Sequence, residues 1–369
     1  MLLTALSALL GSLSAVFAHN IQTTSAPPPT PSGGQGLNVT PAYIPMSDFD
    51  FQSLNLALNQ EFLEFELFHR GLAQFTPAEF EAVGINVEDQ FFIEYMADQE
   101  NGHAIMLSNI LQGAGAKSCT YNLTFTNVRN FINICQQVAS FGEAGVFGFL
   151  EHLDSRAASQ LLLQSIATEG RQQMGFRQLL GLFPMPTFFM PAFTQSMQWT
   201  LMAPFISACP ASNPRIAFQN FPALTILNNP DAETLNNSTV VGENNLAALS
   251  HNRTTPLSFP GRQVDFSWEL PGRIVGPNNS FTTTTTAGQP RFALWISQLN
   301  ITYTPLENLN GTTATTIQPD TTVFGDGTAS TFNGTMFIAI TDLDLFVTPF
   351  NFSSVNPHIV AGPAVYQAG

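Results

Sequence analysis

Four stretches of this chain repeat apolar residues at helical spacing, and each carries one glutamate in the middle of its apolar face. At about 100° per residue, the face around the first glutamate also holds Leu54, Leu58, Phe65, Phe68 and Leu72. The four glutamates are Glu61, Glu100, Glu143 and Glu169. A buried carboxylate is costly unless it is protonated, paired or bound to a metal. One such residue on each of four helices therefore predicts a shared site inside a four-helix bundle.

The helical periodicity also sets the expected limits of the bundle. Short connections between long helices imply antiparallel neighbours, so residues 47–185 are predicted to form one four-helix bundle. A helix-start signal at Thr76-Pro77 allows a short extra helix between the first two. The long helices are expected at residues 49–73, 87–112, 126–152 and 155–181.

The character of the chain changes at about residue 235, where helical periodicity stops and Thr, Asn, Pro and Gly become frequent. Strand-like runs follow at residues 264–270, 291–304 and 335–348. We expect a β-sandwich-like domain over 235–369, preceded by a packed extension with one short helix over 186–234. The predicted fold class is α+β multidomain, and 369 residues permit two domains with separate cores.

The N-terminal sequence predicts export from the cell. Residues 1–18 have an apolar core that ends in small residues, which is typical of a signal peptide cleaved before His19. Residues 19–46 are rich in Pro, Ser and Gly and are predicted to be a flexible leader. No later stretch reaches 18 apolar residues, so no membrane span is expected. These features favour an extracellular or cell-wall location.

Charged residues make up only 10% of the chain, against about 25% in typical soluble domains. In an exported protein, N-linked glycans can keep such a surface soluble, and we expect a glycoprotein. Eight of the ten acceptor triplets lie beyond residue 230. The ten acceptors are Asn38, Asn122, Asn236, Asn237, Asn252, Asn278, Asn300, Asn310, Asn333 and Asn351.

The charge balance argues against a nucleic-acid partner. The chain has 26 acidic and 11 basic residues, and Lys117 is its one lysine. Binding to phosphates requires clusters of basic residues, which the sequence lacks.

Three cysteines are present, and an oxidising compartment favours one disulfide and one free thiol. Cys119 and Cys209 lie in loop-like sequence and are predicted to pair. Cys135 falls within a helical pattern and is predicted to be a buried thiol. No Cys/His spacing typical of a zinc site is found.

Two further positions connect the glutamates with metal binding. Di-metal bundles place a Glu-x-x-His motif on each of two helices, because i and i+3 share a face. Glu100 and His103 form this motif, whereas its expected counterpart pairs Glu169 with Gln172. An amide oxygen can bind a hard cation but replaces imidazole poorly at iron. Iron or manganese is the expected cofactor if a metal is bound.

The sequence resembles secreted fungal ferritin-like proteins described as stress-response, desiccation-related or late sexual development proteins. The resemblance is carried by ALNQEFLEFELFHRG (57–71), the long segment 142–186, QWTLMAPFISACP (198–210) and several strand-like segments. It covers nearly the whole predicted mature chain and implies a ferritin-like bundle, without an established biochemical activity. The ligands that it implies are Glu61 or Glu64, Glu100, His103, Glu143 and Glu169.

Several interpretations of the chain are therefore open. The glutamates either bind a divalent metal or form a remnant cluster of protonated acids, with Arg171 and Arg177 as pairing partners. The favoured function is a non-enzymatic stress-response or sexual-development protein. One alternative is a di-iron or di-manganese oxidase or peroxide scavenger. Another is a cell-wall carbohydrate-binding protein that stacks sugars on Trp268, Trp295 and Tyr303.

Overall fold

The computed structural model describes residues 43–234 and 256–369. The predicted signal peptide and nearly all of the leader lie outside these residues. So do four of the predicted glycan acceptors, which are Asn38, Asn236, Asn237 and Asn252.

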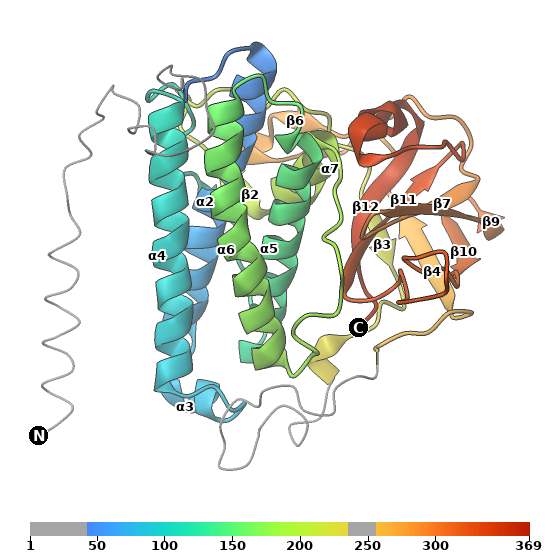
Figure 1. Ribbon diagram of the computed structural model, residues 1–369, viewed down its shortest axis with the longest axis horizontal. Helices are drawn as coiled ribbons and strands as arrows, with labels where there is room; N and C mark the ends of the chain where they lie inside the picture. Colours follow the sequence, from blue (N-terminus) through green and yellow to red (C-terminus); the bar gives the residue numbers. More distant parts are fainter. Residues whose placement is uncertain (1–42, 235–255) are drawn as a thin grey trace, which may run out of the picture. The chain divides into compact units, whose positions relative to one another are not determined.

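Four long helices lie side by side and form the predicted ferritin-like bundle (Figure 1). They are α2 (Asp48–Gln74), α4 (Val87–Ile110), α5 (Val128–Leu150) and α6 (Arg156–Leu180). Each begins at a Ser or Asn whose side chain accepts a backbone N–H of the first turn, which satisfies one of the donors left free there. The predicted extra helix is α3 (Pro77–Glu81), held by a capping box between Thr76 and Glu79. A shorter helix, α7 (Gln195–Met202), follows the bundle.

The C-terminal region contains two four-stranded antiparallel sheets. The first has the order β3-β4-β10-β9 and the second has the order β12-β11-β7-β8. The strands of the first sheet are β3 (Leu224–Ile226), β4 (Gln263–Trp268), β9 (Glu307–Asn310) and β10 (Thr313–Ile317). Those of the second are β7 (Phe292–Ser297), β8 (Asn300–Pro305), β11 (Thr335–Thr341) and β12 (Ile359–Gln367).

Several strands differ from the sequence prediction. The run predicted at 291–304 is a hairpin, because the chain turns at Gln298 (φ 51°) between β7 and β8. Strand β3 belongs to the first sheet although it lies in the predicted extension. Two small pairs were not predicted because strands of two or three residues carry almost no periodicity. These are β1 (Thr120–Tyr121) with β2 (Ile206–Ala208), and β5 (Ile274–Val275) with β6 (Phe281–Thr282).

Strand β11 is buried along its whole length because both of its faces are covered. Ile338 and Ile340 join Phe266 of the other sheet in the core of the sandwich. The alternate residues Phe337 and Ala339 belong to the core of the helices. A strand that is covered on both faces reads as a continuous apolar run, which explains the sequence MFIAI.

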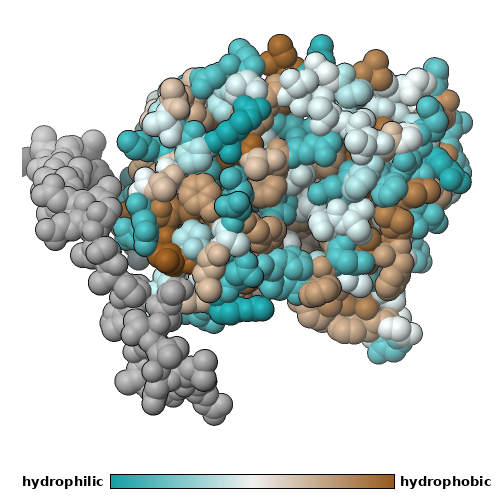
Figure 2. Space-filling view, turned by 90° about the horizontal axis from the view of Figure 1, so that it is seen from above, coloured by the Kyte–Doolittle hydropathy of each residue, from teal (hydrophilic) through white to brown (hydrophobic). Residues whose placement is uncertain are grey.

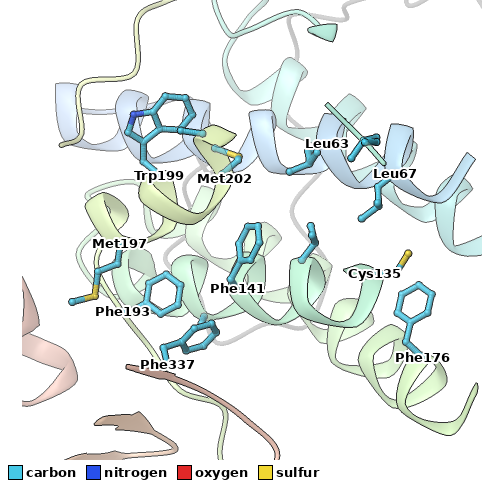
Figure 3. Close-up of a cluster of buried hydrophobic side chains, with 14 of the residues drawn as sticks. Leu63, Leu67, Cys135, Phe141, Phe176, Phe193, Met197, Trp199, Met202 and Phe337 are labelled. Carbon is cyan, nitrogen blue, oxygen red and sulfur yellow. The ribbon is translucent and has the colours of Figure 1, made fainter. Parts of the chain in front are cut away.

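The core of the helices therefore extends onto one face of the second sheet, while a separate core fills the space between the two sheets. Figure 3 shows Phe337 of β11 beside Phe193, close to Phe141 of α5. The rings of Phe193 and Phe337 meet edge to face with centroids 4.7 Å apart. Polar contacts cross the same boundary, since Gln367 Nε2 donates to Asn133 Oδ1 at 2.6 Å.

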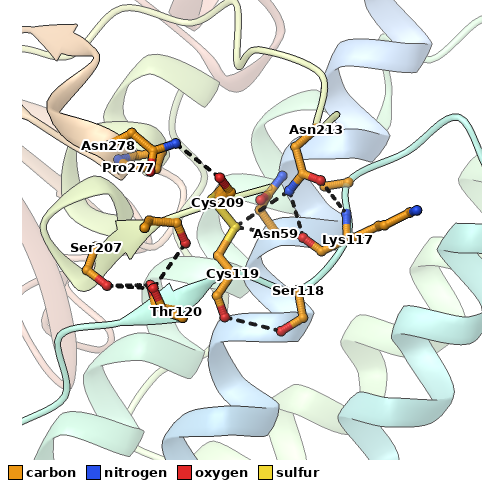
Figure 4. The surroundings of a disulfide bond; sticks show 12 residues. Asn59, Lys117, Ser118, Cys119, Thr120, Ser207, Cys209, Asn213, Pro277 and Asn278 are labelled. Carbon is orange, nitrogen blue, oxygen red and sulfur yellow. Dashed lines mark hydrogen bonds between the residues drawn. A yellow bond between two sulfur atoms is a disulfide. The ribbon is translucent and has the colours of Figure 1, made fainter. Parts of the chain in front are cut away.

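Cys119 and Cys209 form a disulfide beside the β1–β2 pair (Figure 4). The side chain of Asn213 holds the backbone of Lys117 nearby. Its Nδ2 donates to Lys117 O at 2.7 Å, and its Oδ1 accepts from Lys117 N at 3.0 Å. Cys135 is a free thiol, fully buried on α5.

Hydrophilic and hydrophobic residues are interspersed on the face seen in Figure 2. No helix among the described residues is long and apolar enough to cross a membrane. Asn300 and Asn333 are half-buried, and their amides donate to Thr331 Oγ1 and Pro186 O. The other described glycan acceptors, Asn122, Asn278, Asn310 and Asn351, are exposed.

Candidate metal centre

Three of the glutamates and one histidine meet inside the bundle. Glu61 comes from α2, Glu100 and His103 from α4, and Glu169 from α6. Each offers one ligand atom, and these four atoms all lie within 4.8 Å of one another. Hard cations bind oxygen at about 2.0–2.6 Å, so ligands on opposite sides of an ion stand about 4–5 Å apart. The spacing therefore suits a single divalent ion.

The imidazole of His103 faces the carboxylates through Nδ1. This atom lies 3.0 Å from Glu100 Oε2 and 3.2 Å from Glu61 Oε2. Glu169 Oε1 is 4.0 Å away. The i, i+3 spacing on α4 places Glu100 and His103 on one face of the helix, as the sequence motif requires.

Thr168 fixes the other side of the same ring. Its hydroxyl donates to Ser165 O at 2.6 Å, so its oxygen is left to accept from His103 Nε2 at 3.0 Å. With the proton held on Nε2, neutral His103 carries its lone pair on Nδ1, towards the carboxylates. A hydrogen bond of this kind orients the ligating imidazole in metal sites.

Burial changes the ionisation of these groups. Desolvation raises the pKa of Glu61 to about 8, although the hydrogen bond from His103 works against it. Desolvation and the neighbouring Glu61, Glu64, Glu100 and Glu143 raise the pKa of Glu169 well above its usual value. Burial lowers the pKa of His103, but its hydrogen bonds to Glu100 and Glu61 outweigh this and raise it to about 11. Without an ion, the centre therefore holds extra protons, including an imidazolium.

Buried polar atoms without a hydrogen-bond partner lie in and beside the cluster, among them Glu169 Oε2 and Gln172 Oε1. Buried polar groups in native proteins normally have partners. A cation between the side chains would supply the missing interaction for carboxylate and amide oxygens. The donor set of three carboxylates and one imidazole fits iron or manganese, which accept both ligand types.

The other three predicted ligands lie near this group but outside it. Both carboxylate oxygens of Glu64 are buried without a hydrogen bond, and desolvation followed by the charges of Glu100 and Glu61 raises its pKa. Gln172 Nε2 donates to Glu100 Oε1 and, at 3.1 Å, to Gln99 Oε1. Glu143 Oε2 accepts a hydrogen bond from Gln173 Nε2, and burial raises the pKa of Glu143 to about 8.

Two participants were missed by sequence reasoning. Thr168 and Gln173 are sequence neighbours of the predicted ligands Glu169 and Gln172. The Glu-x-x-His motif specifies only positions i and i+3, so it does not include them. The suggested pairing of Arg177 with the glutamates is wrong, because its guanidinium donates to Phe183 O and Gly369 O.

The aromatic residues suggested for sugar stacking are not available on the surface. Trp295 is completely buried and Trp268 is 8% exposed, because both fill the core between the two sheets. Tyr303 is half-buried and packs against the helical core. These rings therefore support the sandwich rather than a carbohydrate platform.

Comparisons with known proteins agree with the bundle. Residues 49–182 match the family described as "Ferritin-like domain". The chain is also 47% identical to protein rds1 of Schizosaccharomyces pombe over 346 residues, which cover 92% of this chain and 86% of that protein.

Proposed function

Since the chain belongs to the fungal ferritin-like family that includes protein rds1 of Schizosaccharomyces pombe, we propose that it holds one divalent metal ion in its bundle. The main support for this proposal is one cluster of side chains, whose ligand atoms lie within 4.8 Å of one another. The cluster consists of Glu61, Glu100, His103 and Glu169. The proposed role is a non-enzymatic, secreted glycoprotein of stress response or sexual development. The predicted signal peptide and the four exposed acceptor asparagines support secretion and glycosylation.

The side chains of the centre define what each would do. Glu61, Glu100 and Glu169 supply oxygen ligands, and His103 supplies Nδ1 after losing the proton that it shares with Glu61 and Glu100. Iron or manganese bound there would offer Lewis-acid or one-electron chemistry. The ion would also neutralise acids whose burial is otherwise costly, and we therefore expect binding to stabilise the fold.

A second ion is the requirement of the alternative function, a di-metal oxidase or peroxide scavenger. The second ion would need further ligands, including Glu143 of α5 and Gln172 of α6. Gln172 occupies the place of the histidine in the second Glu-x-x-His motif. Gln172 offers a neutral amide in place of imidazole, and Glu143 is held by Gln173. These features favour one ion over two.

Metal content tests the proposal. Protein purified without chelators and loaded with Mn²⁺ or Fe²⁺ should contain about one ion per chain, measured by plasma mass spectrometry. The double variant Glu100→Ala/Glu169→Ala should lose it. The control Glu94→Ala, at a partly exposed glutamate on the same helix that pairs with His69 and not with the centre, should keep it. Two ions per chain would favour the oxidase, and no ion in the loaded wild-type protein would refute the centre.

Secretion and glycosylation need a separate test. Expression in a fungal host should release the chain into the medium, and glycosidase treatment should increase its gel mobility. Retention of the full-length, unglycosylated chain inside the cells would contradict this part of the proposal.

A further inference from the structure

A pocket opens between α6 and the segment that follows it, residues 184–191. Its volume is about 280 Å³, and its walls include Gly170 and Gln173 on α6, Phe188 and Phe189 on the segment, and Thr335 on β11. Met185 and Phe188 on the outer wall are 68% and 61% exposed, so the pocket communicates with solvent. None of the roles described above uses this pocket.

The inner wall of the pocket touches Glu143, which lies beside the carboxylate centre. Gln173 donates its amide to Glu143 Oε2, and Glu143 acts electrostatically on Glu169. On the other side of the same carboxylate, a Cβ atom added to Gly170 would stand 3.3 Å from Glu143 Oε1. Glu143 therefore lies directly behind two residues of the pocket wall.

The missing side chain of Gly170 matters because of space and not because of backbone conformation. Gly170 lies within α6 and is not among the residues with positive φ. A glycine inside a helix costs about 1 kcal/mol relative to alanine, so the position gives up helix stability. Apart from its chain neighbours and the backbone of its own helix, the described residues place one heavy atom within 4 Å of the added Cβ, which is Glu143 Oε1, so a side chain there would fill the gap between pocket and carboxylate.

The charge of the pocket lining determines which solutes can enter the pocket. Arg171 and Arg177 both line it, in a chain with only 11 basic residues and a net charge of -15. The exposed guanidinium of Arg171 raises the local potential, which repels cations and attracts anions, whereas the guanidinium of Arg177 is buried and donates to Phe183 O and Gly369 O. The methionine and phenylalanine side chains of the walls accept uncharged molecules as well.

From this geometry we infer that the pocket is an entrance through which small neutral or anionic solutes reach Glu143, and that Gly170 keeps its inner end open. This inference rests on the proposed centre and gives it a second approach. The first lies at His103, whose side chain is 12% exposed.

Thiol accessibility tests the entrance without a metal. In the full chain carrying Glu143→Cys, the new thiol is treated with methanethiosulfonates that differ in charge: the methyl, sulfonatoethyl and trimethylammonioethyl reagents. The wild-type chain, whose one free cysteine is the buried Cys135, gives the background. After each rate is divided by the rate of the same reagent with a free thiol in solution, the neutral and anionic reagents should react about tenfold faster than the cationic one, a ratio that a difference of about 1.4 kcal/mol in barrier produces.

A glycine pair provides the matched control. Adding Gly170→Val should slow the neutral and anionic reagents about tenfold or more, because the branched side chain fills the inner end. Adding Gly102→Val should leave the rates unchanged, because outside its own helix no heavy atom of the described residues lies within 4 Å of the Cβ position. Circular dichroism confirms folding, and Gln173→Cys replaces Glu143→Cys as the reporter if that variant does not fold.

A faster normalised rate for the cationic reagent, equal rates with and without Gly170→Val, or no reaction above background would each overturn the entrance. Failure of the proposed function is seen separately, as absence of metal in the loaded wild-type chain. A reactive thiol with no bound metal in the wild type would refute only the centre. An unreactive thiol with one bound ion would refute only the entrance.

Discussion

His103 is held at both ring nitrogens, and this fixes the nitrogen that it presents to the carboxylates. Nδ1 meets Glu100 and Glu61, while Nε2 donates to Thr168. The hydroxyl of Thr168 is itself oriented by Ser165 O, so the arrangement has one consistent set of donors and acceptors.

Replacement of Thr168 should therefore weaken metal binding without removing a ligand. Thr168→Val keeps the shape of the side chain but loses the acceptor, and we expect the dissociation constant for Mn²⁺ to rise about 10–100-fold. Thr168→Ser retains the hydroxyl and should bind nearly as well as wild type. Isothermal titration calorimetry measures both, and equal affinities for the valine and serine variants would contradict the assigned role.

Glu143 should make the metal-free protein less stable as pH rises. Burial raises its pKa from 4.5 to about 8 in the folded state. Between these values the folded chain keeps a proton that the unfolded chain has lost. The folded state then binds more protons, and the free energy of unfolding falls by up to about 1.4 kcal/mol per pH unit. This contribution is fully present below pH 4.5 and lost above about pH 8.

Urea unfolding of the chelator-treated protein between pH 5 and 8 measures this effect. Glu143→Gln should flatten the pH dependence, whereas Glu307→Gln on the exposed strand β9 controls for the loss of a surface carboxylate. A Glu143→Gln profile as steep as that of wild type would show that Glu143 is ionised throughout.

The sequence predicted which glutamates are buried in the bundle, but not which side chains they contact. Apolar periodicity placed Glu61, Glu100 and Glu169 inside the bundle because burial of a helical face follows from spacing alone. It did not predict that Glu143 would contact Gln173 while Gln172 contacts Glu100. That distinction depends on the rotation of each helix about its axis, which packing against the neighbours decides.

At the level of elements, close contacts between α5 and the segment before α7 depend on glycine. A Cβ at Gly148 would stand 1.7 Å from Phe193 O, whereas Phe193 N donates to Ala144 O at 3.1 Å. The segment thus lies directly against the helix backbone, and from there Phe193 reaches Phe337 of β11.

Gly148→Ala should therefore lower the free energy of unfolding by about 2–3 kcal/mol, since the segment must move away from α5. Gly102→Ala should instead raise it by up to about 1 kcal/mol, because alanine is the better helix former and space is open there. Urea unfolding of both variants checks the contrast. A stabilising effect of Gly148→Ala would show that the segment is not held against the helix.

The helices followed from the sequence to within about two residues because caps and apolar stripes are local signals. The short strands could not be predicted from the sequence in this way. Strand β3 is recognised only through its pairing with β4, about 40 residues later in the chain, and a local pattern carries no information on that partner.

At the level of the whole molecule, the disulfide joins the loop after α4 to the segment after α7. Cys119 and Cys209 are separated by 90 residues in sequence, and a crosslink over such a loop restricts the unfolded chain strongly. The variant Cys119→Ala/Cys209→Ala should be about 2–5 kcal/mol less stable in urea unfolding. A reducing agent should destabilise the wild type but not the variant, and equal sensitivity of the two would contradict this effect.

The sequence did not predict that the core of the helices continues onto one face of β11. The change in composition near residue 235 indicated a boundary between two regions, whereas β3, at Leu224–Ile226, already belongs to the first sheet. Composition could not show that Phe337 and Ala339 pack with the helices while Ile338 packs with the other sheet. The continuous apolar run of β11 was the one available sign that both faces of the strand are covered.

The most direct test of the account is to locate the ion. A crystal of the manganese-loaded protein, measured with X-rays at the manganese absorption edge, should show one anomalous peak per chain among Glu61, Glu100, His103 and Glu169. His103 should face that peak through Nδ1. No peak in the bundle, or a peak away from these four residues, would contradict the proposed metal centre.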